Sequence, residues 1–223
     1  MPKEWRRYMK KEGKIIEIDY TNKDRAYINE LMDFLETNCE EITDFFDNLT
    51  FAQKVKIKLW PDLEDFRCHF PWQVGVMRRE KGRNYIHVLS FDEYKKTKGH
   101  EKKTLEDYNL LFLHEFVHAC VKEYAHNHNM TITNKNTYLW LQVGLATKLS
   151  HQYEKHSLQL TASLEDILTN KATYNDYYTM FCYVLNTYGA AYIKSLILDF
   201  QKLKTETPKL YKEAVEANKS QYC

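Results

Sequence analysis

The chain has 223 residues, of which 43% are hydrophobic and 28% are charged, a balance typical of a globular protein. The formal net charge is only +1, so no charge excess points to nucleic acid or to a membrane surface. With 6 glycines and 4 prolines the composition disfavours a sandwich of many short strands and favours helices. These numbers bound the protein to one large domain or two small ones.

The cysteines are odd in number and scattered, and they form no C-x-x-C pair: Cys39, Cys68, Cys120, Cys182 and Cys223. This spacing indicates free thiols in a reducing compartment. The first twenty residues are highly charged and lack the apolar core of a signal peptide, and no apolar run approaches the length of a membrane span. We therefore expect a cytoplasmic protein, provided that no signal segment has been removed.

The first part of the chain carries strand patterns separated by helical ones. Alternating or apolar runs predict four strands, and helical spacing predicts one long helix capped by Asn22 or Asp24 and one short helix after Asp62. The expected strands are Ile15–Tyr20, Lys54–Trp60, Trp72–Arg79 and Asn84–Ser90. The long helix is expected to end at about Asn48, and the short helix is expected at Leu63–Arg67.

The later part of the chain is predicted to be helical. After a polar loop, Thr104 and Asp107 form the capping-box pattern at the start of a long, apolar helix. A polar connection, 126–136, precedes further helices at Tyr138–Tyr153, from Ser163, at Tyr174–Thr187 ending near Gly189, at Ala190–Lys204 and at Lys209–Asn218. Strands first and helices after indicate an α+β fold: an N-terminal α+β subdomain, 1–125, and a C-terminal helical subdomain, 126–223.

The long helix contains the pattern H-E-x-x-H, at His114-Glu115-Phe116-Val117-His118. Residues four apart share one face of a helix, so His114 and His118 can bind one zinc ion while Glu115 stands beside it as a general base. Chance produces this pattern in about 3% of chains of this composition, so its surroundings must decide.

The chain resembles the gluzincin metallopeptidases, specifically the small peptidase-MA-like domains. Four segments carry the resemblance, which runs from about residue 15 to about residue 198: Lys54–Phe66, Tyr85–Ser90, His114–His118 and Trp140–Ala146. It implies a zincin-like fold with a central active-site helix, zinc bound by His114 and His118, and hydrolysis of peptide bonds through a metal-bound water with Glu115 as general base. It also implies that Tyr178 stabilises the oxyanion, with Tyr177 as the neighbouring candidate, and that Tyr85–Ser90 is an edge strand that pairs with an extended peptide.

One residue departs from the family pattern. The segment Trp140–Ala146 matches the form W-L-x-E-G-L-A, whose Glu is the third zinc ligand, but this chain has Val143 there. Valine offers no lone pair to a metal. Gln142 points about 100° away around the helix and carries a poor ligand. A bend at Asn127 could return His126 or His128 to the metal. Cys120 is expected to be a core residue, and Glu123 lies too far along the helix axis to join the two histidines.

Two functions from different classes follow. The first is a zinc-dependent metallopeptidase with a peptide or protein substrate. The second is a degenerate, catalytically impaired zincin that acts as a peptide-binding or regulatory domain, because Val143 replaces the expected ligand. A third interpretation is that position 143 carries a changed residue and the parent protein has Glu. A nucleic-acid or membrane partner is not expected, and the oligomeric state is not readable from these residues.

Overall fold

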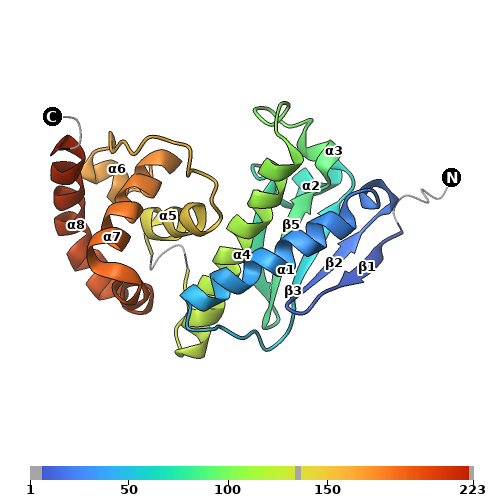
Figure 1. The fold of residues 1–223 in the computed structure, drawn as a ribbon, viewed down its shortest axis with the longest axis horizontal. Coiled ribbons are helices and arrows are strands. Elements are labelled where there is room, and N and C mark those ends of the chain that lie inside the picture. Colours follow the sequence, from blue (N-terminus) through green and yellow to red (C-terminus); the bar gives the residue numbers. More distant parts are fainter. Residues whose placement is uncertain (1–6, 134–136, 221–223) are drawn as a thin grey trace. The chain divides into compact units, whose positions relative to one another are not determined.

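The computed structural model describes residues 7–133 and 137–220, and it has an N-terminal five-stranded mixed sheet followed by a mostly helical part (Figure 1). This arrangement confirms the predicted α+β class. The chain divides into two compact units, Met1–Cys120 and Val121–Cys223, and the division falls within helix α4 (Leu105–Asn127). The first unit also contains β1 (Met9–Glu12), β2 (Ile16–Tyr20), η2 (Asn22–Asp24), α1 (Ile28–Phe45), β3 (Val55–Trp60), α2 (Leu63–His69), β4 (Gly75–Glu80), β5 (Arg83–Leu89) and α3 (Phe91–Tyr94).

The strand order is β1-β2-β3-β5-β4, with β2, β3 and β5 parallel and with β1 and β4 antiparallel at the two edges. The expectation that Tyr85–Ser90 forms an edge strand is therefore wrong, because β5 lies between β3 and β4. The physical reason is the tight turn at Lys81 and Gly82, which both have positive φ and fold β4 back along the outer side of β5. On this side of the sheet the edge strand is β4.

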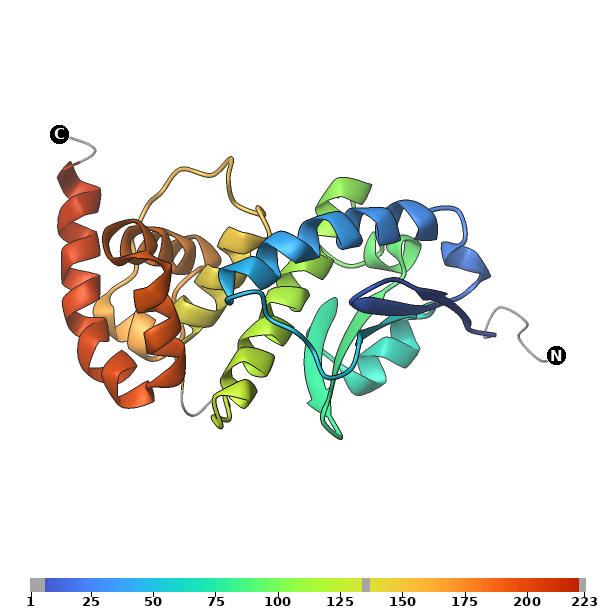
Figure 2. The same ribbon diagram turned by 60° about the horizontal axis from the view of Figure 1, so that its bottom comes forward.

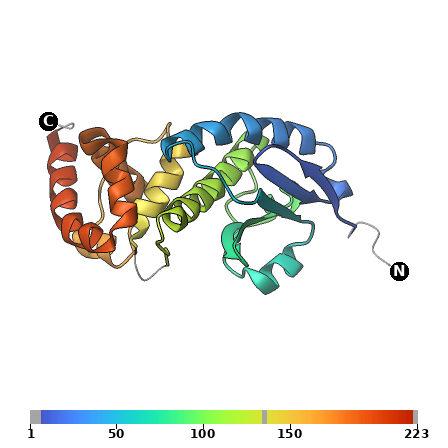
Figure 3. The ribbon, with the colours of Figure 1, turned by 90° about the horizontal axis from the view of Figure 1, so that it is seen from below.

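The two faces of the sheet differ in the way the alternating sequence predicts. Val55, Ile57 and Leu59 of β3 are fully buried, and Ile57 pairs with the buried Ile86 of β5. Helices α1 and α4 lie along this apolar face, whereas α2 lies on the opposite side of the sheet (Figures 1 and 3). Burial of these apolar side chains is what holds the motif helix against the sheet.

Two features of the first unit differ from the sequence prediction. Strand β1 was not predicted, because its sequence MKKE has no apolar alternation and its pairing with β2 alone makes it a strand. Helix α1 begins at Ile28 and not at residues 22–24. The Asp24 carboxylate accepts hydrogen bonds from the Thr21 amide (2.8 Å) and the Tyr27 hydroxyl (2.6 Å), which closes a separate 3-10 turn first.

The second unit is helical, with α5 (Leu139–Leu149), α6 (Leu164–Leu168), α7 (Tyr174–Leu198) and α8 (Phe200–Ser220), and α7 and α8 run side by side (Figures 1 and 2). Gly189 has φ 78° and interrupts α7, as its sequence position predicted. The predicted break before Lys209 is wrong, because Pro208 lies inside α8. The buried Leu203, Thr207, Leu210 and Ala214 recur at helical spacing across the proline, and their packing outweighs its cost.

The connection predicted at 126–136 begins later than expected, because α4 continues to Asn127, and residues 134–136 lie outside the described part of the chain. Helix α5 ends at Leu149 and not near Tyr153, and His151 just beyond it has φ 61°, a left-handed conformation that stops a helix. Among the described residues, no helix is both long enough and apolar enough to cross a membrane.

The start of α7 predicts a pH-dependent stability. The buried Asp176 carboxylate accepts hydrogen bonds from the backbone amides of Thr161 (2.7 Å) and Ala162 (3.0 Å) and from the Thr173 hydroxyl (2.6 Å). Burial alone would raise its pKa, but these hydrogen bonds lower the pKa below the ordinary 3.8. Asp176→Asn should lower the free energy of unfolding at pH 7 by about 1–3 kcal/mol.

The same carboxylate gives the sign of the pH effect. A lowered folded-state pKa contributes stability that is present above the unfolded pKa and is lost as the pH falls through the folded pKa. Urea unfolding should therefore show a difference between wild type and Asp176→Asn that shrinks below about pH 4, where the unfolded carboxyl becomes protonated. A difference that stays constant from pH 7 to pH 3 would contradict the assignment.

Candidate metal centre

The helix that carries H-E-x-x-H is fixed at its start and along its buried side. The Thr104 amide donates to the Asp107 carboxylate (2.9 Å) and the Asp107 amide donates to the Thr104 hydroxyl (3.1 Å), which confirms the predicted capping box. The Tyr108 hydroxyl donates to the Leu89 carbonyl (2.7 Å), which ties the helix to the end of β5. Phe116, inside the motif, is fully buried with its ring 5.6 Å from that of Phe51.

The structure brings the two motif histidines together. The Nε2 atoms of His114 and His118 lie 3.2 Å apart, and the rings are inclined by 77°. Two nitrogens that bind one zinc ion tetrahedrally at about 2.0–2.1 Å lie about 3.3–3.4 Å from each other. The separation of the two nitrogens is therefore close to the one that a shared zinc ion requires, and it is also a hydrogen-bond distance between the two rings.

Glu115 and His114 are both buried, with 8% and 5% of their surface exposed, and His118 is half-buried. A buried carboxylate is costly unless a metal, a water molecule or a hydrogen-bond donor compensates it. The helix thus holds an ionisable acid beside a potential metal-binding pair in surroundings that limit access of water.

The edge strand β4 begins beside the motif helix. A Cβ atom on Gly75 would lie 3.2 Å from the Leu111 side chain, and Leu111 precedes His114 by one helical turn. Sequence reasoning assigned the edge to β5, and the turn residues Lys81-Gly82 are the signal that indicates β4 as its hairpin partner.

The segment Trp140–Ala146 forms most of α5, in the second unit, and its matching residues are packing residues. Trp140 is fully buried and donates its indole N–H to the Thr207 hydroxyl (3.2 Å). A Cβ atom on Gly144 would lie 2.5 Å from the Phe181 Cβ and 2.6 Å from the Tyr177 carbonyl oxygen. Val143 is buried, with 5% of its surface exposed.

The other residues considered as a third ligand lie on α5, on α4 or just after α4, and they differ in burial. Gln142 is half-buried on α5, His126 is exposed, and the His128 ring lies 2.8 Å from the Tyr124 carbonyl oxygen. Cys120 and Glu123 are buried on α4. Within 7–133 and 137–220, no three histidine, cysteine, aspartate or glutamate side chains gather into a set that could hold a metal ion.

Tyr178, the predicted oxyanion residue, is a buried residue of α7 with its ring 5.8 Å from that of Tyr153. Its hydroxyl is hydrogen-bonded to the Cys182 thiol, and burial together with that neighbour raises the pKa of Tyr178. Its neighbour Tyr177 is also buried, in contact with the α5 glycine. The catalytic role of Tyr178 stays a prediction.

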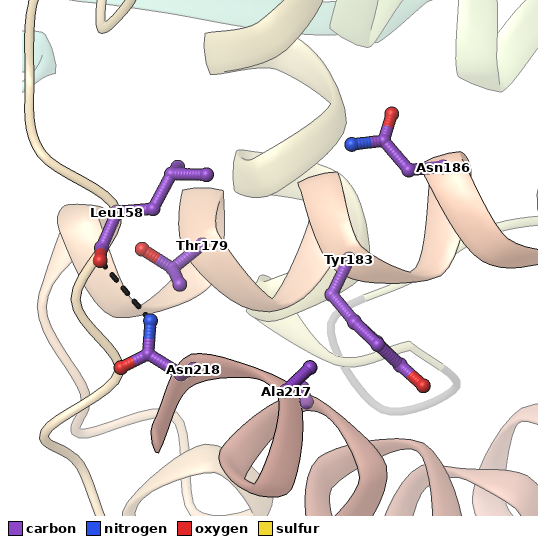
Figure 4. Close-up of a pocket in the computed structure, with 7 residues that line it drawn as sticks. Leu158, Thr179, Tyr183, Asn186, Ala217 and Asn218 are labelled. Atoms are coloured by element: carbon purple, nitrogen blue, oxygen red, sulfur yellow. Dashed lines mark hydrogen bonds between the residues drawn. The ribbon is translucent and has the colours of Figure 1, made fainter. Parts of the chain in front are cut away.

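The second unit contains a pocket of about 250 Å³ that lies between α7, α8 and the chain before α6 (Figure 4). The Asn218 side-chain amide donates to the Leu158 carbonyl (3.1 Å) across one end of it. The remaining lining residues are uncharged: Thr179, Tyr183, Asn186, Ala214 and Ala217. The pocket shares no residue with the H-E-x-x-H motif.

No protein-family model, curated protein or solved structure shows a significant match to this chain.

Proposed function

We propose that this protein is a zincin-like metallopeptidase homologue whose motif helix binds zinc through His114 and His118. The observation that carries the proposal is the 3.2 Å separation of the two Nε2 atoms, which a shared metal ion fits. The i, i+4 spacing produces this separation, and the capping and burial of α4 keep the helix in place.

The residues of the motif divide the chemistry between them. Zinc, when bound, polarises a carbonyl group and makes a water molecule more acidic. Glu115 then accepts a proton from the attacking water and returns it to the leaving amine, and its buried position favours such transfers by keeping bulk water away. Tyr178 is proposed to donate its hydroxyl proton in a hydrogen bond to the developing oxyanion.

The proposed substrate is an extended peptide that pairs with β4. An edge strand offers unpaired N–H and C=O groups to an incoming strand, and β4 begins against Leu111 of the motif helix. A peptide added to β4 would therefore run past the start of α4, near the motif. This replaces β5, which already has neighbours on both sides.

The alternative is a degenerate zincin that binds peptides without hydrolysing them. Val143 favours it, since a buried valine occupies the position that the resemblance assigns to a carboxylate ligand. Changes around metal ligands typically cost 10–100-fold in metal affinity or activity, so the loss of a direct ligand should cost at least about as much.

Zinc content and hydrolysis together test the first proposal. We expect the purified protein to retain zinc after dialysis, and His114→Ala and His118→Ala each to lose it. Glu115→Gln should keep zinc and lose at least about 100-fold in the hydrolysis of a fluorogenic peptide library. His156→Ala, a substitution of an exposed histidine, is the matched control.

Each outcome decides between the two functions. Zinc that survives in both histidine variants shows binding elsewhere, and His126→Ala then tests the predicted substitute ligand. No zinc and no hydrolysis in wild type would sink the peptidase proposal and favour the degenerate zincin. Hydrolysis that is unchanged in Glu115→Gln would contradict the role of Glu115 as general base.

A further inference from the structure

The sheet face that is turned away from α1 and α4 carries a group of cationic and aromatic side chains, here called the outer face. Strand pairing places Lys58 opposite His87, and Arg78 opposite Tyr85. These four residues and Trp60 are exposed or half-buried, whereas Ile57, Leu59, Met77, Ile86 and Val88 on the other face of the same strands are buried. The face therefore shows aromatic side chains in the middle and a cation on each side.

The acidic residues that β2 places on the neighbouring part of this face are already paired, and β4 places the exposed Glu80 at its far end, opposite Arg83. Glu17 lies 2.9 Å from the Arg83 guanidinium and 3.5 Å from the Lys56 ammonium, and Asp19 lies 2.7 Å from Lys56. The carboxylates of Glu17 and Asp19 and the cations of Arg83 and Lys56 thus neutralise one another at this end. The cations at the other end of the face, Lys58 and Arg78, have different neighbours.

Lys58 and Arg78 lie over aromatic rings and not against carboxylates. The Lys58 ammonium is 3.9 Å from the centre of the Trp60 ring, and the Arg78 guanidinium is 4.8 Å from that of Phe70. Within the described residues, neither cation forms an ion pair with a carboxylate. Cation–π contacts hold both side chains in position while their charge stays available to an anion.

His87 lies between the two cations as a neutral hydrogen-bond donor. The Trp60 indole N–H donates to His87 Nδ1 (3.3 Å), so Nε2 carries the proton, and Phe70 stacks on the imidazole at 5.0 Å. Burial, with Lys58, Arg78 and His69 nearby, lowers the pKa of His87 to about 4. A neutral imidazole N–H between two cations is a set of donors suited to an oxygen anion.

An exposed tryptophan follows this cluster in the chain. Trp72 is 94% exposed and comes two residues after Phe70, within about 7 Å along the backbone. Tryptophan is enriched among the residues that dominate protein interfaces, and a ring left this far in water gains free energy when a partner covers it.

We propose that the outer face docks an acidic segment of a partner polypeptide, with carboxylates on Lys58 and Arg78 and an aromatic side chain on Trp72. The charge pattern favours a polypeptide over nucleic acid. A continuous polyanion would extend beyond the two cations to the part of the face where Arg83 and Lys56 are already paired with carboxylates, whereas a peptide places its carboxylates at separate points. The proposal does not depend on the metal centre or on hydrolysis.

Fluorescence anisotropy with the full chain tests this surface. The probe is a fluorescein-labelled peptide of alternating glutamate and tyrosine, compared with a lysine–tyrosine peptide and with labelled oligo(dT). We expect binding of the acidic peptide alone, and a weakening as salt rises. Lys58→Gln and Arg78→Gln should each weaken binding about threefold to tenfold, and Trp72→Ala about tenfold or more.

Lys102→Gln is the matched control, because Lys102 is an exposed lysine of the same unit outside the outer face, and it should leave the affinity unchanged. Nuclear magnetic resonance of the imidazole gives a second readout: bound peptide should raise the pKa of His87, since its carboxylates offset the two cations. Absence of binding to the acidic peptide, equal losses in Lys102→Gln and Arg78→Gln, or tighter binding of oligo(dT) would each overturn the proposal.

Discussion

Val143→Glu is expected to raise the zinc affinity of this protein by at least about 100-fold, because it restores a carboxylate at the position that the resemblance assigns to the third ligand. Isothermal titration with zinc measures the change directly. The prediction rests on the proposed zinc site at His114 and His118. His118→Ala in the Val143→Glu background should abolish the gain, since only His114 and the new carboxylate would then remain as ligands.

In the same variant, zinc should offset a loss of stability that the substitution causes in the absence of metal. Val143 is buried, so without metal the new carboxylate should lower the free energy of unfolding by about 1–3 kcal/mol. Zinc at 100 times its dissociation constant should then add about 2.7 kcal/mol. Val143→Gln is the control, with the same length and no charge. Equal zinc affinity in the glutamate and glutamine variants would show that position 143 does not face the metal.

Gly144→Ala is expected to lower the free energy of unfolding by about 1–3 kcal/mol or more, as overpacking of a core does. An added Cβ atom would lie 2.5 Å from the Phe181 Cβ and 2.6 Å from the Tyr177 carbonyl oxygen. Neither is the flexible end of a side chain, so α5 and α7 must separate. Chemical denaturation followed by circular dichroism measures the change.

The sign of this result is informative. Helix propensity alone predicts that replacing glycine by alanine inside a helix stabilises the protein by about 0.5–1 kcal/mol. Gln142→Ala, on the half-buried side of the same helix, provides the reference for a change without overpacking. A stabilised Gly144→Ala variant would show that the close approach of α5 and α7 is wrong.

The Val143→Glu and Gly144→Ala predictions test two explanations of the segment Trp140–Ala146, metal binding and packing. Its matches to the family pattern at Trp140, Gly144 and Ala146 are buried or closely packed residues of the second unit. Packing alone therefore gives this chain a reason to have them. Val143 is the position at which packing and metal binding make different demands, and it carries a residue that suits packing.

The outer face illustrates a site that the sequence did not predict. Alternation along β3 correctly gave Lys58 a solvent side, but an exposed lysine is ordinary in a strand. Lys58, Arg78 and His87 come from three strands, and only the pairing order β3-β5-β4 makes them neighbours. The sequence placed Trp72 at the start of a strand, whereas the strand begins at Gly75 and Trp72 lies in the turn before it, with its side chain exposed.

The sequence by itself determined the features that depend on neighbours along the chain. The caps at Thr104 and Ser163, the alternation in β3 and the histidine pair at i, i+4 follow from local geometry. The tertiary structure alone decided the strand order, the existence of β1 and the passage of α8 through Pro208. These depend on partners distant in the chain, whose burial and pairing energies exceed the weak local preferences.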